Sequence, residues 1–447
     1  MSETTPRRAV VIGLGSSGVA AARLLVADGW RVTVSDRAGE PELGTRLAEL
    51  PEGVTTVLGG HPLELLGGVD LVVASPGVRW DLDLLVEARR RGIETIAEVE
   101  LAWRRLAGTP LIGITGSNGK TTTTALLGEI LRAAGLKTAV GGNIGQPASD
   151  HALQGGWDAL VWELSSFQLE GCTTLRPRVG VLLNLSPDHL DRHPTLAAYL
   201  AAKTRLFARQ TADDVAIAGG DDPALADLAV PSRLERFSLA DRSAAAHLAE
   251  GTLVLDGAVL LPRAELPLLG DHNVANALAA ALAAARMGAD RESIARALRT
   301  FKGLPHRHRV VATVAGVRFV DDSKGTNIGA TAAGLAGYPA GTIHLILGGL
   351  GKGQDFAELR PAVAGRVARV YLIGEATDEI AGALAGVVPV ERCGTLDEAV
   401  ARAATQAKRG DTVLLSPACA SFDQFRDYGH RGDEFARLAN AFPGGER

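Results

Sequence analysis

The residues with the clearest chemistry lie in the stretch LIGITGSNGKTTTTALLGEI, where an apolar run leads into a glycine-containing loop. Lys120 and Thr121 then begin a helical pattern. In such a loop the backbone N–H groups surround phosphates, the lysine contacts the terminal phosphates and the hydroxyl binds Mg²⁺. The usual spacing is G-x-x-x-x-G-K-[ST], but here Ile114 occupies the first glycine position and Gly113 stands one residue earlier. The sequence therefore predicts a variant P-loop for ATP, formed by Gly116, Ser117, Asn118, Gly119, Lys120, Thr121 and Thr122.

A second glycine loop lies near the N-terminus, in VVIGLGSSG, where Gly13, Gly15 and Gly18 follow an apolar run. Glycines at this spacing permit a tight turn and a close approach to a pyrophosphate, which the following helix N-terminus attracts. Asp36 ends the next apolar run, where a ribose-binding acid would lie. Alone, this pattern favours a dehydrogenase, with a close-packed turn that binds nothing as the alternative. However, the first domain ends near residue 98, which leaves room for only one of the two nucleotide-binding halves of a dehydrogenase fold.

Further polar residues follow the next apolar runs of the chain. Glu163 ends ALVWELS, where a carboxylate could hold Mg²⁺ opposite Thr121 or merely end a strand. His189 follows the next run, in LSPDHLD, and a position in such a loop favours function over a structural role. Lys203 lies in the helical pattern LAAYLAAKTRLF, which by itself favours a solvated surface lysine.

Composition bounds the class of protein. A chain of 447 residues predicts about three domains. The net charge of −5, with both signs interspersed, argues against a long nucleic-acid footprint. Cys172, Cys393 and Cys419 have neither the spacing of a zinc site nor an even count, so we expect a reducing compartment. With no signal peptide and no membrane span in the sequence, we expect a cytoplasmic protein.

Apolar runs alternate with helical patterns from end to end, which predicts an α/β protein with mainly parallel sheets buried on both faces. The pattern is interrupted near WRRLAGTP and near FKGLPHRHR. We therefore expect three domains, at residues 1–98, 99–303 and 304–447. Within the second, GTLVLDGAVLL predicts a β-hairpin around Asp256 and Gly257.

The chain resembles the Mur ligase family, the ATP-dependent amino-acid ligases of peptidoglycan precursor synthesis, over nearly its whole length. The motifs that carry the resemblance are GITGSNGKTT, GGNIG, ELSSFQLE, NLSPDHLDRH, YLAAKTRLF, GDHNVANALAA, GLPHR, DDSKGTN and LLSPACASFDQFRDYGHRGDEF. The last motif and the short first domain resemble the members that add D-glutamate to UDP-N-acetylmuramoyl-L-alanine. The resemblance implies a Rossmann-like UDP-substrate domain, a central P-loop ATPase-like domain and a Rossmann-like C-terminal domain. It also implies that ATP phosphorylates the substrate carboxylate, and that the amine of D-glutamate attacks the acyl phosphate through a tetrahedral intermediate.

The resemblance also assigns site residues. It implies that the UDP-substrate contacts Gly15, Ser16, Ser17, Asp36, Arg37, Gly77 and Asn143. Beyond the P-loop, it implies ATP contacts from Asn273, Asn276, Arg307 and Asp322. The implied ligands of two Mg²⁺ ions are Thr121, Glu163, His189 and a carbamoylated Lys203, and the implied catalytic residues are Lys120, Glu163, His189 and Lys203. The implied D-glutamate contacts are Lys324, Thr326, Lys352, Ser421 and Tyr428.

Several of these residues have plainer interpretations when the sequence is taken alone. Asn273 or Asn276 could be a helix N-cap, Arg307 a linker charge, and Lys352 a solvated lysine in a glycine-rich turn. In the C-terminal domain, all the implied D-glutamate residues except Tyr428 follow apolar strands, at the edge where open α/β sheets bind ligands.

Four other functions compete with this interpretation. A dehydrogenase leaves the P-loop unused, and a folylpolyglutamate synthase needs no UDP-binding first domain. A non-enzymatic nucleotide-binding regulator would not need Lys203, His189 and Lys352 together. Mur ligases that add L-alanine or a diamino acid share the central domain, but their amino-acid motifs differ from SPACASFDQF. We expect a monomer with no nucleic-acid or membrane partner.

Overall fold

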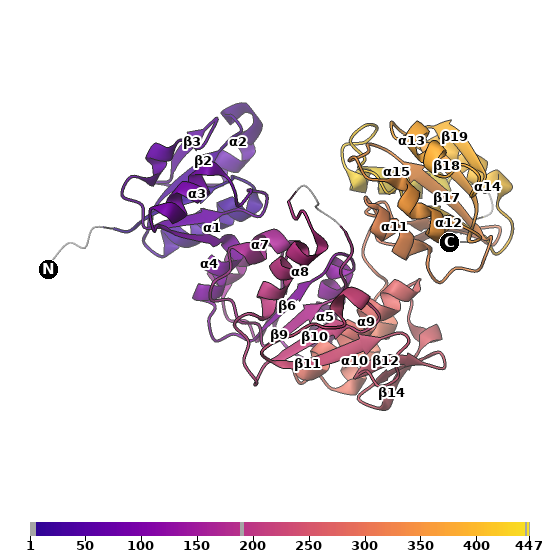
Figure 1. The fold of residues 1–447 in the computed structure, drawn as a ribbon, viewed down its shortest axis with the longest axis horizontal. Helices are drawn as coiled ribbons and strands as arrows, with labels where there is room; N and C mark the ends of the chain where they lie inside the picture. The colour runs from indigo at the N-terminus through magenta and orange to yellow at the C-terminus, as the bar shows by residue number, and fades with distance from the viewer. Residues whose placement is uncertain (1–5, 188–191, 443–444, 447) are drawn as a thin grey trace.

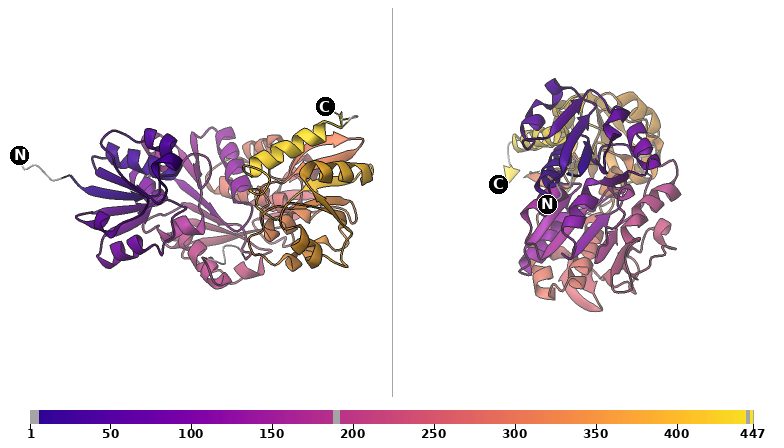
Figure 2. Two further views of the ribbon diagram at one scale, coloured as in Figure 1. Left: turned by 90° about the horizontal axis from the view of Figure 1, so that it is seen from above. Right: turned by 90° about the vertical axis from the view of Figure 1, so that its left-hand side faces the viewer.

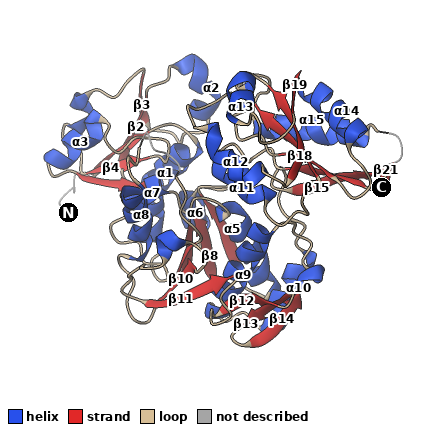
Figure 3. Cartoon of the chain, turned by 45° about the vertical axis from the view of Figure 1, so that its right-hand side comes forward, coloured by secondary structure: helices blue, strands red, loops and turns tan. Residues whose placement is uncertain are grey.

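The computed structural model describes residues 6–187, 192–442 and 445–446. Its strands form three sheets that follow one another along the chain, each in its own lobe (Figure 1). Seen from above, the N-terminal and C-terminal lobes lie at opposite ends of the molecule (Figure 2). Nearly all the central strands pair in parallel, and helices flank the strands of each lobe (Figure 3). The predicted α/β class with mainly parallel sheets is therefore confirmed.

The first sheet has five parallel strands and carries the N-terminal glycine loop between β1 and α1. Across the sheet the strands are β3 (Thr55–Leu58), β2 (Arg31–Asp36), β1 (Arg8–Ile12), β4 (Leu71–Ala74) and β5 (Glu94–Ala97). The helices are α1 (Ser16–Ala27), α2 (Glu40–Ala48), α3 (Asp83–Arg90) and α4 (Glu98–Arg105), with a 3₁₀ turn at Leu63–Leu66. The strand order 3-2-1-4-5 has five of the six strands of the dinucleotide-binding order 3-2-1-4-5-6, so this sheet extends beyond the single nucleotide-binding half that the length of the domain predicts.

The central sheet has nine strands and carries the P-loop between β6 and α5. Across the sheet the strands are β14 (Ala258–Pro262), β13 (Thr252–Leu255), β12 (Ala246–Ala249), β11 (Arg233–Ser238), β10 (Val215–Gly219), β9 (Val179–Leu182), β6 (Leu111–Thr115), β8 (Ala159–Glu163) and β7 (Thr138–Gly142). The helices are α5 (Lys120–Ala133), α6 (Ala148–Gln154), α7 (Ser166–Glu170), α8 (Leu196–Thr204), α9 (Asp271–Arg286) and α10 (Arg291–Thr300). Three 3₁₀ turns lie at Arg205–Phe207, Pro223–Leu225 and Arg263–Glu265. The predicted hairpin is confirmed, because β13 and β14 pair antiparallel around Asp256 and Gly257, both with positive φ.

The third sheet has seven strands. Across the sheet they are β19 (Val390–Gly394), β18 (Val367–Ile373), β17 (Ile343–Gly348), β20 (Thr412–Leu415), β16 (Val317–Asp321), β15 (Arg309–Val314) and β21 (Gly445–Glu446). The helices are α11 (Ile328–Leu335), α12 (Arg360–Val363), α13 (Thr377–Ala383), α14 (Leu396–Gln406) and α15 (Tyr428–Asn440), with a 3₁₀ turn at Phe356–Leu359. The loops after β16, β17 and β20 leave the same edge of three adjacent parallel strands, so the residues that follow these strands lie near one another.

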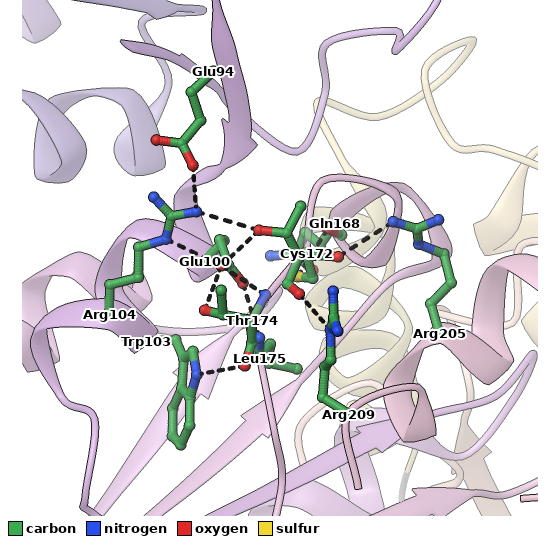
Figure 4. Close-up of polar contacts among 11 residues, drawn as sticks. Glu94, Glu100, Trp103, Arg104, Gln168, Cys172, Thr174, Leu175, Arg205 and Arg209 are labelled. Carbon is green, nitrogen blue, oxygen red and sulfur yellow. Dashed lines mark hydrogen bonds and ion pairs between the residues drawn. The ribbon is translucent and has the colours of Figure 1, made fainter. Parts of the chain in front are cut away.

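The first and central lobes share one apolar core. That core joins α1 and α4 to α6 and to the face of the central sheet that carries Trp162. The carboxylate of Glu100, which is fully buried in α4, accepts hydrogen bonds from Thr173, from the backbone and hydroxyl of Thr174, and from the backbone of Leu175 (Figure 4). A buried carboxylate is stable only when such donors surround it. Glu100 therefore fastens the two lobes together.

A single segment of chain connects the central lobe to the C-terminal lobe. The chain leaves α10 at Thr300 and enters β15 at Arg309. Within this segment His306 Nδ1 lies 2.7 Å from Asp321 Oδ2, at the end of β16. The two breaks in the sequence pattern thus fall at the end of α4, before β6, and in this segment; the domain boundaries themselves stay a prediction. Within the described part of the chain, no helix is long and apolar enough to cross a membrane.

Candidate active site

The P-loop connects β6 to α5, and neighbouring atoms lie close to its glycines. Gly119 precedes α5 with a φ of 83°, and a Cβ there would lie 2.2 Å from Asn276 Oδ1. A glycine is therefore required at this point, for its backbone conformation and because Asn276 packs against it. The loop is also held from the strand beside it: Asn118 N donates to Asn184 Oδ1 (2.9 Å), and Ser186 N donates to Ser117 Oγ (2.9 Å).

Two lysines converge on one carbonyl oxygen of this loop. Lys120 Nζ donates to Gly116 O at 2.7 Å, and Lys203 Nζ donates to the same oxygen at 2.8 Å. The Lys203 residue is 1% exposed, and its ammonium lies 4.2 Å from the ring centroid of Tyr199. The surface-lysine interpretation of Lys203 is therefore wrong. The face of α8 that carries Lys203 packs beneath the P-loop. The helical pattern of the sequence does not show which face is buried.

Glu163 links the P-loop helix to the loop after β7. Its Oε2 accepts from Thr121 Oγ1 at 2.7 Å, and its Oε1 accepts from Asn143 Nδ2 at 2.9 Å. A hydroxyl and a carboxylate side by side are hard oxygen donors of the kind Mg²⁺ prefers, so these residues fit that ion. His189 lies outside the described residues, and among those described no cluster of three or more His, Cys, Asp or Glu side chains could hold a metal.

A cavity of about 710 Å³ opens above these groups, between the central and C-terminal lobes. Among its lining residues are the implied ATP contacts Ser117, Asn118, Gly119, Lys120, Thr121, Thr122, Asn273, Asn276, Arg307 and Asp322. Glu163 and the implied amino-acid contacts Lys324, Thr326 and Lys352 line it too. Gly116, Lys203, Ser421 and Tyr428 do not: Gly116 faces the two lysines, and Lys203 lies beneath the loop.

The asparagines at the start of α9 are not N-caps. Gly270 holds the N-cap position, while Asn273 Nδ2 donates to Leu269 O (2.8 Å) and Asn276 Nδ2 donates to Asn273 Oδ1 (3.1 Å). Both residues are almost fully buried, and both line the cavity. Their capping interpretation is therefore wrong, and they form a polar wall facing the P-loop.

Cations dominate the C-terminal side of this cavity. Burial lowers the pKa of Arg307, against the raising effect of Glu163 and Asp322. Burial also lowers the pKa of Lys324, and the nearby charges of Arg307, Lys352 and Lys120 lower it further. Four cations thus lie close together around the cavity: Arg307, Lys324, Lys352 and Lys120. Such a cluster favours the binding of phosphates and carboxylates.

The implied amino-acid contacts come from the three adjacent strand ends of the third sheet, except Tyr428, which begins α15. Lys324 Nζ lies 3.9 Å from the ring centroid of Tyr428, and Lys352 Nζ donates to Thr326 O at 3.3 Å. Ser421 is 2% exposed, in the loop after β20. Thr326 N donates to Lys324 O at 2.8 Å, so the two pairs are joined by a backbone hydrogen bond.

A second cavity, of about 560 Å³, lies over the N-terminal glycine loop. All seven residues implied for the UDP-substrate line it: Gly15, Ser16, Ser17, Asp36, Arg37, Gly77 and Asn143. A Cβ on Gly18 would lie 1.9 Å from Gly13 O, whereas one on Gly15 would meet nothing within 4 Å. Gly18 therefore serves packing, and Gly15 leaves the backbone open to a ligand. Asp36 accepts from Leu14 N (2.6 Å) and Ala38 N (2.9 Å), which shapes the loop.

Asn143 lines both cavities and is therefore the point at which they meet. Its backbone N–H donates to Glu163 O and its side chain to Glu163 Oε1, both at 2.9 Å. The end of a ligand that fills the N-terminal cavity would therefore reach the acidic group beside the P-loop.

Three kinds of residue at these sites escaped the sequence analysis. Asn184 and Ser186 brace the P-loop, although they lie in a quoted motif. His61 lines the N-terminal cavity, and Arg431 lies fully buried beneath the amino-acid loops. The position of Asn184 after a buried strand could have indicated its role. His61 and Arg431 could not be identified in this way, because their hydrogen-bond partners are brought to them only by the folding of the chain.

Family models match three successive parts of the chain. The Mur ligase MurD-like, N-terminal domain matches residues 7–97, the Mur ligase middle domain matches 114–284, and the Mur ligase, glutamate ligase domain matches 306–419. The chain is also 49% identical, over 97% of both chains, to UDP-N-acetylmuramoylalanine–D-glutamate ligase of Anaeromyxobacter dehalogenans. The chain belongs to the Mur ligase family. A relative of the same name from Myxococcus xanthus is 46% identical over 97% of this Mur ligase and 98% of its own length.

Solved structures agree on the fold of this Mur ligase. The MurF ligase of Thermotoga maritima, solved in complex with ADP, superimposes with a TM-score of 0.61 and 18% identity over 98% of each chain. UDP-N-acetylmuramate-alanine ligase MurC of the same organism gives a TM-score of 0.59 and 18% identity, over 98% of this chain and 100% of its own. The predicted three-domain Mur ligase fold is therefore confirmed.

Proposed function

We propose that this Mur ligase joins D-glutamate to UDP-N-acetylmuramoyl-L-alanine at the expense of ATP, in peptidoglycan precursor synthesis. The observation that carries the proposal is the meeting of the two cavities at Asn143, beside Glu163 and the P-loop. A UDP-substrate in the first cavity would present its carboxylate to ATP in the second. The relatives from Anaeromyxobacter and Myxococcus carry the name of this activity.

The residues divide the chemistry between them. Lys120 and the N–H groups of the P-loop would hold the phosphates of ATP, while Arg307 and Asp322 would hold the nucleotide from the C-terminal side. Phosphorylation of the carboxylate and attack by the amine both gather negative charge on a few oxygens, which the cations around this cavity stabilise. Lys324, Thr326, Lys352, Ser421 and Tyr428 would bind and orient D-glutamate.

Magnesium would be held by Thr121 and Glu163, with His189 for a second ion, and would offset the phosphate charge. We propose that the Lys203 ammonium loses one proton, that the resulting amine adds carbon dioxide, and that a second proton leaves the nitrogen, so that the side chain becomes a carbamate anion. Lys203 is buried on the same carbonyl oxygen as Lys120, so a carbamate at this position would place an anion next to the Lys120 cation.

The proposal predicts which amino acid drives ATP hydrolysis. With UDP-N-acetylmuramoyl-L-alanine and Mg²⁺-ATP, we expect D-glutamate to stimulate phosphate release at least about tenfold more than L-glutamate, L-alanine or a diamino acid. Mass spectrometry of the product would identify the added residue. Stimulation by another amino acid would overturn the D-glutamate assignment but leave an amino-acid ligase, whereas no stimulation by any of them would overturn both.

A further inference from the structure

Arg431, on α15, is a fully buried cation whose hydrogen bonds all end on neutral groups. Its Nε donates to Ser323 Oγ (2.9 Å), and its Nη2 donates to Ser323 O (2.8 Å) and to Cys419 O (3.2 Å). Its Nη1 donates to Ala420 O at 3.2 Å. Asp423 and Asp321 act on this cation only through space, and neither is among its hydrogen-bond acceptors in the described part of the chain. A buried cation without a directly bonded anion is costly in free energy, so a role beyond packing is expected of this one.

The guanidinium lies where the amino-acid loops meet. Ser323 directly precedes Lys324, and Ala420 directly precedes Ser421. The third loop touches the same place, because a Cβ on Gly349 would lie 3.2 Å from Arg431 Nη1. Leu350 and Ala420 also exchange two backbone hydrogen bonds, at 3.0 and 3.1 Å.

The same guanidinium also contacts the start of its own helix, through the hydroxyl of Ser323. Ser323 Oγ accepts from Arg431 and donates its proton to Tyr428 O at 2.8 Å. One planar group with five fixed donors is thus suited to set the spacing of several backbone segments at once. A lysine, with one compact ammonium, could not span these acceptors.

We propose that Arg431 is the positioning residue of the amino-acid site: it holds the loops that carry Lys324, Lys352 and Ser421 in register. The chemistry of the substrate, an amino acid with two carboxylates, rests on the function proposed above. Burial lowers the pKa of Arg431 to about 10, so it stays a cation at neutral pH and adds to the positive potential of the site.

Steady-state kinetics of the full-length protein test this role. In Arg431→Lys and Arg431→Ala, we expect the KM for D-glutamate to rise about tenfold or more, because small displacements of positioned groups weaken binding steeply. The KM values for ATP and for the UDP-substrate should stay within about threefold of wild type. Millimolar guanidinium chloride should partly restore the KM for D-glutamate in Arg431→Ala and leave the wild type unchanged.

Arg437→Ala is the matched control, since Arg437 lies on the same helix but is exposed and pairs with Glu434. Ser323→Ala removes one acceptor of the guanidinium and keeps the test open if the Arg431 variants do not fold, which UDP binding and thermal melting would reveal. An unchanged KM for D-glutamate in folded variants, or equal changes in all three KM values, would overturn the role. Failure of the proposed function would instead appear in the wild type, as phosphate release that D-glutamate does not stimulate.

His61, in the N-terminal cavity, supports a second inference through a chain of hydrogen bonds. The hydroxyl of the buried Ser35 donates to Gly60 O at 2.9 Å, so its only proton is used. His61 Nδ1 lies 2.9 Å from the same hydroxyl oxygen and must therefore carry the proton of that contact. A neutral imidazole protonated at Nδ1 presents a lone pair at Nε2, which bonds to no described residue.

We infer that Nε2 of His61 accepts a hydrogen bond from N3–H of uracil and so selects uracil over cytosine, whose N3 is an acceptor. The inference rests on the proposed UDP-substrate of this cavity. Asp36, the nearby acid, is held in its own loop by the backbone N–H groups of Leu14 and Ala38, one on each carboxylate oxygen. Burial lowers the pKa of His61, Asp36 opposes this shift and Arg37 adds to it, so the neutral form is favoured near pH 7.

Calorimetric binding of UDP and CDP to the whole protein tests this inference. We expect wild type to prefer UDP about tenfold or more, and His61→Phe to lose most of that preference. In wild type, lowering the pH far enough to protonate His61, whose pKa burial lowers, should narrow the preference for UDP, because a protonated ring donates at both nitrogens. Both nucleotides carry the same diphosphate, so the effect of its protonation cancels in the ratio of the two affinities.

His430→Phe, a histidine of α15 outside this cavity, is the control and should keep the wild-type ratio. A UDP preference that survives in His61→Phe would overturn the inference. Wild-type protein that binds neither nucleotide would instead count against the UDP-substrate itself.

Discussion

Replacement of Lys203 by alanine is expected to reduce the rate of ligation by about 100-fold or more. Lys203 is buried beneath the P-loop and contacts the oxygen that Lys120 also contacts, so its loss alters the charge next to the phosphates. If the residue is a carbamate in the active protein, the alanine variant lacks one anion. Added acetate or formate should then enter the space and partly restore the rate, measured as D-glutamate-dependent phosphate release.

Controls separate the carbamate from a simple structural lysine. Lys408→Ala changes an exposed lysine of the C-terminal lobe and should keep the wild-type rate. Lys203→Arg keeps a cation but cannot form the carbamate, so its rate should also fall. Wild type in ¹³C-bicarbonate should show a carbamate carbon signal that both Lys203 variants lack. Full activity in Lys203→Ala would refute any catalytic role, and a rate that acetate and formate do not restore would refute the anion.

Much of the candidate active site is predictable from the sequence because its signals are local. Lys120 and Thr121 follow a strand and begin a helix within one short stretch, and the backbone geometry of that connection fixes where their side chains go. Glu163 and Asp36 are similar cases, since each ends a buried strand at the edge of a parallel sheet where ligands bind. The order of the elements alone places these groups.

Other residues depend on which segments meet in three dimensions. A helical pattern cannot show that the face of α8 bearing Lys203 turns toward the P-loop, which precedes it by two further βα units. Arg431 is a similar case, because its acceptors at Ser323 and Cys419 come from different strand ends. Arginine on an amphipathic helix normally faces solvent, so only the folded chain distinguishes this one.

The last expectation concerns Glu163, which we expect to be the most sensitive acid of the site. Glu163→Gln keeps the size of the side chain but removes its charge, and its single oxygen can accept from Asn143 Nδ2 or from Thr121 Oγ1 but not from both, as the carboxylate does. We expect kcat/KM to fall about 100-fold to 1,000-fold and the Mg²⁺ concentration for half-maximal activity to rise, because a neutral amide binds Mg²⁺ weakly. Titration of the rate with Mg²⁺ measures both effects.

Glu129→Gln is the matched change, because Glu129 lies exposed further along α5, the helix that begins at the P-loop. It should leave both the rate and the Mg²⁺ titration unchanged. UDP affinity should change by less than about threefold in Glu163→Gln, since Glu163 does not line the N-terminal cavity. A Glu163→Gln protein that binds UDP and keeps both the wild-type rate and the wild-type Mg²⁺ titration would show that this carboxylate only connects Thr121 to Asn143. Because Glu163 contacts both loops, a lower rate with an unchanged Mg²⁺ titration would assign it to positioning Asn143 at the junction of the two cavities.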